Sequence, residues 1–145
     1  MLLWVGTSHI AGRGLFTAQA IKHGTWIIQY TGEKIPKGES DQRLAEGNNY
    51  IFQLNARSDI DGKARRNTAR YINHSCDPNC TVQLTTRTIW IVALRDITPG
   101  EELTYNYGYE LDDAAAHPCT CGAANCCGSI LAPQYQDMVK QKRVS

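Results

Sequence analysis

The sequence predicts one mainly β domain made of short strands in small sheets, with few short helices. Runs of four to seven residues are rich in β-branched and aromatic side chains, and turn-forming Gly, Pro, Asn and Asp separate most of them. No apolar pattern of helical spacing lasts twelve residues, residues 135–143 excepted. The 145 residues are enough for one sizeable core and too few for two ordinary domains.

The expected elements follow this pattern along the chain. Strands are predicted at residues 2–5, 25–30, 50–54, around Ile60, and at 81–84 and 88–94, with a hairpin turn at 85–87. Residues 12–16 are interpreted as a glycine-flanked turn, and Ser40 is expected to cap one short helix that runs through Leu44 and Ala45. The segments that start at Ile21 and Ile97 share a spacing of isoleucine and glycine, but too few positions match to indicate a duplication.

Charge and composition exclude several classes of protein. Fifteen Lys and Arg against fourteen Asp and Glu give a net charge of +1, too weak a field to indicate binding to nucleic acid or to an anionic membrane. The apolar residues 1–5 stop at Gly6 and are too few for a signal peptide or a membrane span. We therefore expect a soluble intracellular monomer, cytoplasmic, or nuclear if the source is eukaryotic or the protein acts on a host.

The densest chemistry lies in residues 70–80, Arg-Tyr-Ile-Asn-His-Ser-Cys-Asp-Pro-Asn-Cys. These eleven residues carry an amide, an imidazole, a hydroxyl, two thiols and a carboxylate, and they end in an Asp-Pro-Asn turn signal. Such a cluster buries little apolar surface, so packing alone does not explain it. We expect the stretch to join a cofactor pocket to a metal site.

The cysteine spacing favours a metal site. Four of the six cysteines fall within nine residues, and the sequence shows no export signal. Residues 119–126 place three thiols in a Cys-x-Cys-x4-Cys arrangement, one ligand short of a tetrahedral zinc site. Cys76, in the dense polar turn, is the candidate for the fourth ligand. Cys80 and Cys127 are left over, with Cys127 as the better alternative ligand, and unlinked thiols or disulfides remain the other interpretation.

Aromatic residues form a third group. Tyr105 and Tyr107 alternate along the chain, Tyr30 precedes Gly32, and Phe52 lies in a predicted strand. Alternating aromatic residues usually pack in a core or across strands. The functional alternative is a narrow aromatic channel for a cationic or partly desolvated amine.

The Gly-Arg-Gly motif at residues 12–14 does not indicate a nucleotide loop. A third glycine at the required spacing, a Lys-Ser/Thr pair and a following long helix are all missing. On its own, the motif predicts a tight turn.

Together these motifs resemble the SET-domain family of protein lysine methyltransferases over residues 12–128. Residues 12–16 resemble the first cofactor motif of that family, and residues 30–33 its Tyr-x-Gly-Glu segment. Residues 70–79 are similar to its Arg-Phe-x-Asn-His-Ser-Cys-x-Pro-Asn, and residues 100–107 to its Gly-Glu-Glu-Leu-x-Phe/Tyr-Asp-Tyr. The final cysteines resemble the post-SET zinc segment. The sequence departs from the family at Asn106, where Asp is common, and at Arg66, where glycine is usual.

The resemblance implies a β-clip fold with a C-terminal pseudoknot, in which S-adenosylmethionine and the target lysine enter from opposite faces. It divides the chain into a SET domain at 1–112, a post-SET zinc-binding segment at 113–131 and a tail at 132–145. The implied cofactor contacts are Gly12, Arg13, Gly14, Arg70, Asn73, His74 and Tyr107. The implied catalytic residues are Tyr107, Tyr105 and Tyr30, and the implied lysine-channel residues are Tyr30, Phe52 and Tyr105. One structural zinc ion would be held by Cys76, Cys119, Cys121 and Cys126.

The expected activity is therefore that of an S-adenosylmethionine-dependent protein lysine N-methyltransferase acting on a histone tail or another protein. The hydroxyl of Tyr105 leaves less room in the channel, which favours mono-methylation. Two alternatives stay open: a catalytically silent, zinc-stabilised module that binds a peptide, and a methyltransferase for a non-histone protein.

Overall fold

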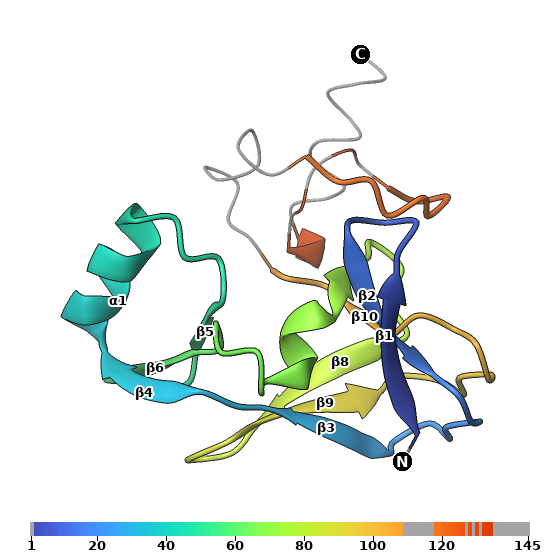
Figure 1. The fold of residues 1–145 in the computed structure, drawn as a ribbon, viewed down its shortest axis with the longest axis horizontal. Coiled ribbons are helices and arrows are strands. Elements are labelled where there is room, and N and C mark those ends of the chain that lie inside the picture. The colour runs from blue at the N-terminus through green and yellow to red at the C-terminus, as the bar shows by residue number, and fades with distance from the viewer. Residues whose placement is uncertain (1, 109–117, 127, 129, 131, 135–145) are drawn as a thin grey trace.

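The computed structural model describes residues 2–108, 118–126, 128, 130 and 132–134, and this part of the chain is mainly β, as predicted (Figure 1). In chain order its elements are β1 (Leu3–Thr7), β2 (Arg13–Thr17), β3 (Trp26–Tyr30), β4 (Glu33–Pro36), α1 (Lys37–Ala45), β5 (Ile51–Gln53), β6 (Ser58–Asp61), the 3-10 helix η1 (Thr68–Tyr71), β7 (Asn73–His74), β8 (Cys80–Leu84), β9 (Ile89–Ala93) and β10 (Thr104–Tyr105). The predicted helical pattern at 135–143 lies outside the described residues. Among the residues described, no helix is long and apolar enough to cross a membrane.

The N-terminal hairpin pairs β1 with β2 in antiparallel register. The prediction of a turn over residues 12–16 was wrong, because only Gly12, with a φ of 44°, lies before the strand. From there the chain pairs with β1, buries Leu15 completely, and stacks the ring of Phe16 on that of Trp4 with centroids 4.3 Å apart. This cross-strand packing outweighs the low strand propensity of the glycine inside β2.

The antiparallel sheet β3-β9-β8 carries much of the hydrophobic core. Ile89 and Ile91 of β9 are fully buried. The strands predicted here are confirmed to within one residue at each end. The predicted hairpin turn is confirmed as well, since the Thr85 N–H donates to the Thr88 carbonyl at 2.9 Å.

A second lobe, at the left of Figure 1, consists of the sheet β4-β6-β5 and the helix α1. The strands predicted at 50–54 and around Ile60 are confirmed as β5 and β6. Ser40 is not the helix cap: the helix starts three residues earlier, directly after the extended Pro36, and the Ser40 hydroxyl donates back to the Pro36 carbonyl at 3.3 Å. The prediction failed because β4 runs into the helix without a loop in which a serine could cap it.

The two segments with a shared isoleucine and glycine spacing pair with each other. Ile21 and Ile97 exchange both backbone hydrogen bonds, at 2.9 and 2.7 Å. The glycine that follows each isoleucine also donates its N–H to a backbone carbonyl. Gly24 donates to Ala93, and Gly100 donates to Thr17. The two similar segments therefore lie side by side and are joined at Ile21 and Ile97.

The short parallel pair β7-β10 brings the polar stretch 70–80 beside the segment that carries Tyr105. Asn79 locks this junction from within: it accepts the Thr104 N–H at 2.9 Å and donates to the Glu102 carbonyl at 2.8 Å. Both bonds are made by a side chain that is 3% exposed. Residues about 30 apart in the sequence are thus held in one place, next to the functional site.

Candidate functional site

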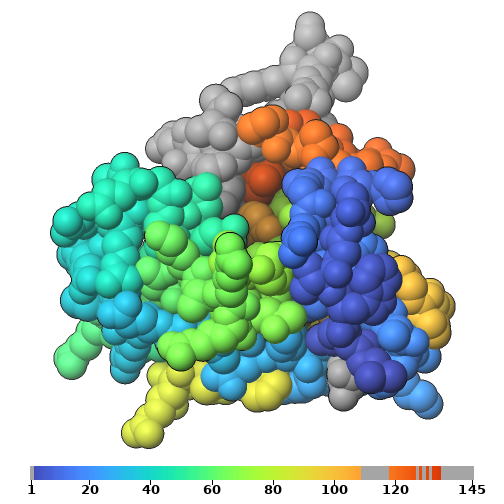
Figure 2. Space-filling model, viewed as in Figure 1, coloured from blue at the N-terminus to red at the C-terminus, as the bar shows by residue number. Residues whose placement is uncertain are grey.

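A cavity of about 1080 Å³ opens where the two lobes, the hairpin β1-β2 and the C-terminal segment meet. In Figure 2 the surface is hollowed between the blue N-terminal strands and the green segments, below the orange segment. One wall, here called the polar wall, is formed by Ala11, Gly12, Arg13 and Asn73. A second part of the lining, here called the aromatic wall, is formed by Tyr30, Phe52, Tyr105 and Tyr107.

The aromatic wall is a continuous row of rings. Ring centroids are 5.1 Å apart for Tyr30 and Phe52, 6.0 Å for Phe52 and Tyr105, and 5.0 Å for Tyr105 and Tyr107. Hydrogen bonds fix the ends of the row, because the Tyr30 hydroxyl donates to the Tyr50 carbonyl at 2.8 Å and the Tyr107 hydroxyl to the Ile72 carbonyl at 2.6 Å. Such a surface disfavours a charged amine through desolvation and tolerates a methylated one.

The polar wall is held by the side chain of Asn73. Its Nδ2 lies 3.0 Å from both the Ala11 and the Arg13 carbonyl oxygens and 2.9 Å from Oε2 of Glu102. The amide therefore fastens the loop between β1 and β2. A ligand at this wall would meet backbone groups and the open side of Gly12, where a Cβ would have no neighbour within 4 Å.

Arg70 also faces the cavity. Its guanidinium lies 4.4 Å from the ring centroid of Tyr50 and 5.3 Å from that of Tyr71, and it donates to the Lys63 carbonyl. Its Nε is buried and has no hydrogen-bond partner. Together with Arg13, it makes the cavity electropositive, because no Asp or Glu occurs among the described residues that line it.

His74 connects Tyr107 to the cysteine cluster. It is buried, and this burial lowers its pKa to about 4. The neutral ring accepts the Tyr107 N–H at Nδ1, at 3.0 Å, so its proton sits on Nε2, which lies 3.5 Å from the Cys76 sulfur. His74 thus spans the distance between the aromatic wall and the cysteines.

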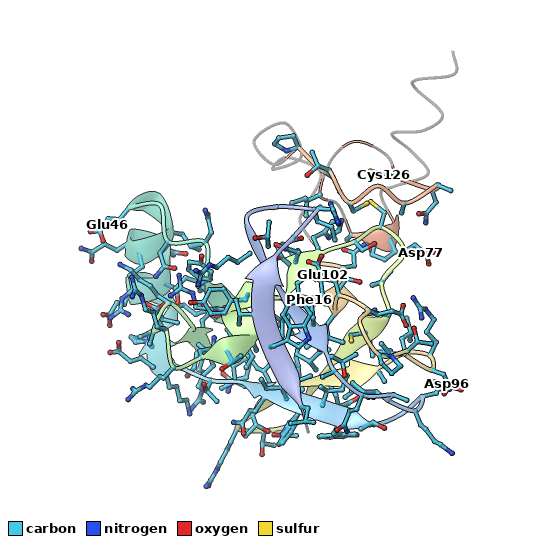
Figure 3. The ribbon with its side chains drawn as sticks, turned by 45° about the vertical axis from the view of Figure 1, so that its right-hand side comes forward. Phe16, Glu46, Asp77, Asp96, Glu102 and Cys126 are labelled. Carbon is cyan, nitrogen blue, oxygen red and sulfur yellow. The ribbon has the colours of Figure 1, made fainter. Side chains whose placement is uncertain are left out.

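Four thiols converge at the C-terminal segment. Figure 3 labels one of these residues, Cys126, above Asp77. The sulfur atoms lie within 4.8 Å of one another, and the residues are Cys76, Cys119, Cys121 and Cys126. A tetrahedral zinc with Zn–S bonds of about 2.3 Å requires sulfurs about 3.8 Å apart. The Cys76–Cys119 pair, at 3.9 Å, meets this requirement, so the donor set fits zinc.

The thiols differ in how readily they ionise. Burial raises the pKa of Cys119 to about 12. Burial acts in the same direction on Cys121, but hydrogen bonds from the backbone and the neighbouring thiols outweigh it, and the pKa falls to about 7. Cys80 lies apart in the core, where burial raises its pKa to about 12, and Cys127 lies outside the described residues.

The structure brings most of the predicted site residues into one place. The residues that line the cavity are Gly12, Arg13, Tyr30, Phe52, Arg70, Asn73, Tyr105 and Tyr107. Gly14 and His74 do not line it. Sequence reasoning gave no role to Ser8 or to the side chain of Glu102, which support the polar wall. Ser8 carries no sequence signal, whereas Glu102 stood inside a recognised motif.

Comparison with known proteins agrees with this geometry. The family model described as the SET domain matches residues 12–108. The chain belongs to the SET domain family. Among the curated relatives of this SET domain, the H3 lysine-4 specific histone-lysine N-methyltransferase of Saccharomyces cerevisiae is 40% identical over 135 residues, covering 85% of this chain and 12% of that protein. The histone-lysine N-methyltransferase trithorax of Drosophila virilis is 39% identical over 128 residues, covering 82% and 3%.

A solved structure agrees too. A humanized mutant of the Chaetomium thermophilum Polycomb Repressive Complex 2, bound to the inhibitor GSK126, contains a chain 33% identical to this SET domain with a TM-score of 0.64. The match covers 73% of this chain and 15% of that chain. The chain thus spans a small part of the length of the relatives it matches.

Proposed function

We propose that this SET domain is an S-adenosylmethionine-dependent protein lysine N-methyltransferase. The observation that carries the proposal is a single cavity with two unlike walls, a glycine-containing loop with backbone acceptors on one side and a row of aromatic rings on the other. A methyl donor bound at the polar wall and a lysine bound at the aromatic wall would share this one cavity, which an in-line displacement between them needs.

The polar wall suits S-adenosylmethionine, which supplies an activated methyl group when bound. Gly12 leaves space for close approach, and Arg13 and Asn73 lie beside it. Arg70 has a buried Nε without a partner, a donor that a carboxylate ligand would satisfy. These residues would hold the cofactor through backbone groups, a guanidinium and the edge of Asn73.

The aromatic wall would deliver the lysine as a neutral amine. A free lysine has a pKa of about 10.4 and is protonated at neutral pH. Two effects lower that pKa here: desolvation by the rings, and repulsion by Arg13 and Arg70, which line the same cavity. Since no Asp or Glu lines the cavity within the described residues, these two effects take the place of a carboxylate base.

Tyr107 would orient the reacting groups. Its hydroxyl hydrogen is donated to the Ile72 carbonyl at 2.6 Å, so its oxygen presents acceptor capacity toward the cavity. Tyr105, whose ring is 5.0 Å away, brings a second hydroxyl and reduces the room for added methyl groups. We therefore propose mono-methylation as the main product.

The substrate would be an extended peptide. In the order β4-β6-β5, strand β5 lies at the edge of its sheet, and residues 49–56 around it line the cavity. An added strand would pair with this edge and place its lysine between the rings. Because the relatives are named histone-lysine N-methyltransferases, we propose a histone tail, H3 before the others, as the first substrate to test.

The zinc cluster would close this site. We propose that residues 1–112 form the SET domain, that 113–131 form the zinc segment and that 132–145 form a tail; the boundary at 112 lies outside the described residues. Ile130 of the zinc segment lines the cavity, and Asn125 donates to the Cys76 carbonyl at 3.0 Å. Zinc would therefore stabilise the wall beside the cofactor.

The test is methyl transfer from S-adenosylmethionine with a labelled methyl group to an array of histone and non-histone peptides. Label on lysine-containing peptides, absent when the lysine is replaced by arginine, is the expected result. Label confined to non-histone peptides would keep the reaction and reject the histone substrate. Peptide binding without S-adenosylmethionine binding in calorimetry would indicate the silent binding module and overturn the proposal.

A further inference from the structure

We infer that Ser8, Asn73 and Glu102 form a clamp that fixes the loop of residues 8–13, and that Glu102 is a positioning residue for the cofactor. The inference rests on the proposed function for the identity of the ligand. The clamp itself is a property of the free chain.

The Glu102 carboxylate joins segments that are far apart in the sequence. Ser8 Oγ lies 2.8 Å from both carboxylate oxygens, and Asn73 Nδ2 lies 2.9 Å from Oε2. Ser8 belongs to the loop after β1, Asn73 to β7, and Glu102 to the segment before β10. In Figure 3 Glu102 lies centrally, close to Phe16 of β2, with which it forms a backbone bridge.

Two members of the clamp, Ser8 and Asn73, bond the backbone of the loop directly. The Ser8 hydroxyl accepts the Ile10 N–H at 2.9 Å, and the Ser8 N–H donates to the Gly12 carbonyl at 2.9 Å. Asn73 Nδ2 reaches the Ala11 and Arg13 carbonyls, both at 3.0 Å. The carboxylate thus fixes the hydroxyl and the amide that, in turn, fix the loop.

The carboxylate of Glu102 accepts hydrogen bonds from two side chains at once. Asn73 has two amide hydrogens but four oxygens within reach, and Ser8 has one hydrogen to give. The two oxygens of the Glu102 carboxylate give the Ser8 hydroxyl and the Asn73 amide an acceptor each. No ion pair to Glu102 is found in the described part of the chain, so its side-chain partners there are these neutral donors.

Gly14 is shaped to this carboxylate. A Cβ at Gly14 would lie 2.4 Å from Glu102 Oε2 and 2.7 Å from its carboxyl carbon, so the carboxylate would have to move away from its place in the clamp. Gly14 does not line the cavity, in contrast to Gly12. The two glycines of the Gly-Arg-Gly motif therefore do different things: Gly12 leaves room at the cavity, and Gly14 leaves room for the clamp.

The zinc segment holds the same loop from the other side. The Thr120 hydroxyl, next to Cys119 and Cys121, donates to the Ile10 carbonyl at 2.5 Å. The polar wall is thus fixed between the clamp and the cysteine cluster. Its conformation depends on both.

The first test is Glu102→Gln, with the adjacent Glu101→Gln as the matched control. Glu101 accepts hydrogen bonds from Thr98 and Arg95 and makes no side-chain contact with the loop. The glutamine turns one of the two acceptor oxygens into a donor, so it cannot accept from both Ser8 and Asn73, and the Kd for S-adenosylmethionine should rise about tenfold, the loss of one hydrogen bond. The kcat at saturating cofactor and the affinity for peptide should not change. Glu101→Gln should leave the cofactor Kd unaltered.

A second readout needs no cofactor. Backbone amides of residues 10–13 should exchange hydrogen faster in Glu102→Gln than in the wild-type chain or in Glu101→Gln. Faster exchange in a chain that binds no S-adenosylmethionine would reject the proposed function and keep the clamp. Unchanged exchange with unchanged Kd would overturn the clamp. A fall in kcat and Tm without a change in Kd would show a purely structural carboxylate and overturn the positioning role.

A double-mutant cycle with Gly14→Ala and Glu102→Ala tests the steric part. Gly14→Ala alone should weaken cofactor binding, because its methyl group displaces the carboxylate. In the Glu102→Ala background the same change should have a smaller effect, since the atoms it would meet at 2.4 and 2.7 Å are gone and only the tight contact with Ser8 Cβ at 3.1 Å remains. Fully additive effects of the two substitutions would contradict the proposed contact.

Discussion

The two walls of the cavity are built by different forces. The aromatic wall is a row of rings 5.0 to 6.0 Å apart, packed against the hydrophobic core. The polar wall is a loop held by the side-chain hydrogen bonds of Ser8, Asn73 and Glu102. Ring packing tolerates changes of shape within limits, whereas a hydrogen-bond network fails when one donor or acceptor changes.

Because the two walls are built differently, we expect each wall to serve a different function in the same cavity. The aromatic wall would set the ionisation of the lysine and the number of methyl groups, and the polar wall would set cofactor affinity. Substitutions on one wall should then leave the function of the other intact. Tyr107 and His74 are the exceptions, because the Tyr107 N–H donates to His74 and His74 reaches Cys76.

The largest effect is expected for Tyr107→Phe. The change removes the hydroxyl that is fixed on the Ile72 carbonyl and keeps the ring against Tyr105. We expect kcat to fall by about 100-fold or more, comparable to the loss of one preorganised polar group in an active site. The Kd for S-adenosylmethionine, measured by calorimetry, should stay the same. Turnover near the wild-type rate would reject Tyr107 as a catalytic residue.

Cys76→Ser should come next, with Cys80→Ser as its control. Cys76 belongs to the four-thiol cluster and Cys80 is buried outside it. Elemental analysis should find about one zinc per wild-type chain and per Cys80→Ser chain, as a four-cysteine site predicts, and much less in Cys76→Ser. Cofactor affinity should fall about tenfold with the metal, because the segment that supports the loop at Ile10 is released. Full zinc content with wild-type affinity in Cys76→Ser would refute the coupling.

Tyr105→Phe should change the product more than the rate. Removing the hydroxyl enlarges the space between Phe52 and Tyr107, the two rings on either side. Mass spectrometry of the methylated peptide should show more di- and trimethyllysine, with the cofactor Kd unchanged. An identical distribution of products from the two proteins would argue against control by Tyr105.

The smallest effect is expected for the stability of the lobe formed by the sheet β4-β6-β5 and the helix α1. An ion pair and hydrogen bonds around Asp61 support this lobe. Asp61 of β6 accepts hydrogen bonds from Arg43 and Asn48, at 2.6 and 3.0 Å. Burial raises the pKa of Asp61, but the bonds from Asn48, Arg43 and the Lys63 N–H lower it by more, so the net pKa lies below the usual value. A carboxyl with a lowered folded pKa stabilises the fold at neutral pH, and this contribution is lost as the pH falls through that pKa.

Urea unfolding at pH 7 and in mild acid measures this contribution. The free energy of unfolding should fall less toward low pH in Asp61→Asn than in the wild-type chain. Asp41→Asn, on the exposed face of α1, is the control and should keep the wild-type slope. Equal slopes in all three proteins would show that Asp61 does not support the lobe by its charge.

Much of this could be predicted from the sequence, where the signal was local or carried by a motif. The strands in the sheet β3-β9-β8 follow from runs of β-branched residues. The ligand count predicted a fourth cysteine beside the C-terminal three, and the dense polar turn around Cys76 made it the candidate, a choice over Cys127 that cysteine spacing alone could not make. Strand β2 was missed because its pairing with β1 is a tertiary effect that overrides the propensity of glycine. Ser40 was misplaced because a strand that runs directly into a helix leaves no place for a cap.

The clamp of Ser8, Asn73 and Glu102 could not be predicted from the sequence for another reason. Ser8 and Glu102 are 94 residues apart, and nothing in a single serine signals its partner. Gly14 seemed equivalent to Gly12 until the carboxylate beside it was located. Motifs thus pointed to most of the residues around the cavity but not to Ser8, and only the three-dimensional arrangement separated the residues that line the cavity from those that support its wall.

The separation of the two walls is tested most directly by one titration of S-adenosylmethionine into three proteins, the wild-type chain, Glu102→Gln and Tyr105→Phe. Calorimetry should give one site per wild-type chain, a Kd about tenfold higher for Glu102→Gln, and an unchanged Kd for Tyr105→Phe. No binding to the wild-type chain, or an equal loss of affinity in both variants, would contradict the account.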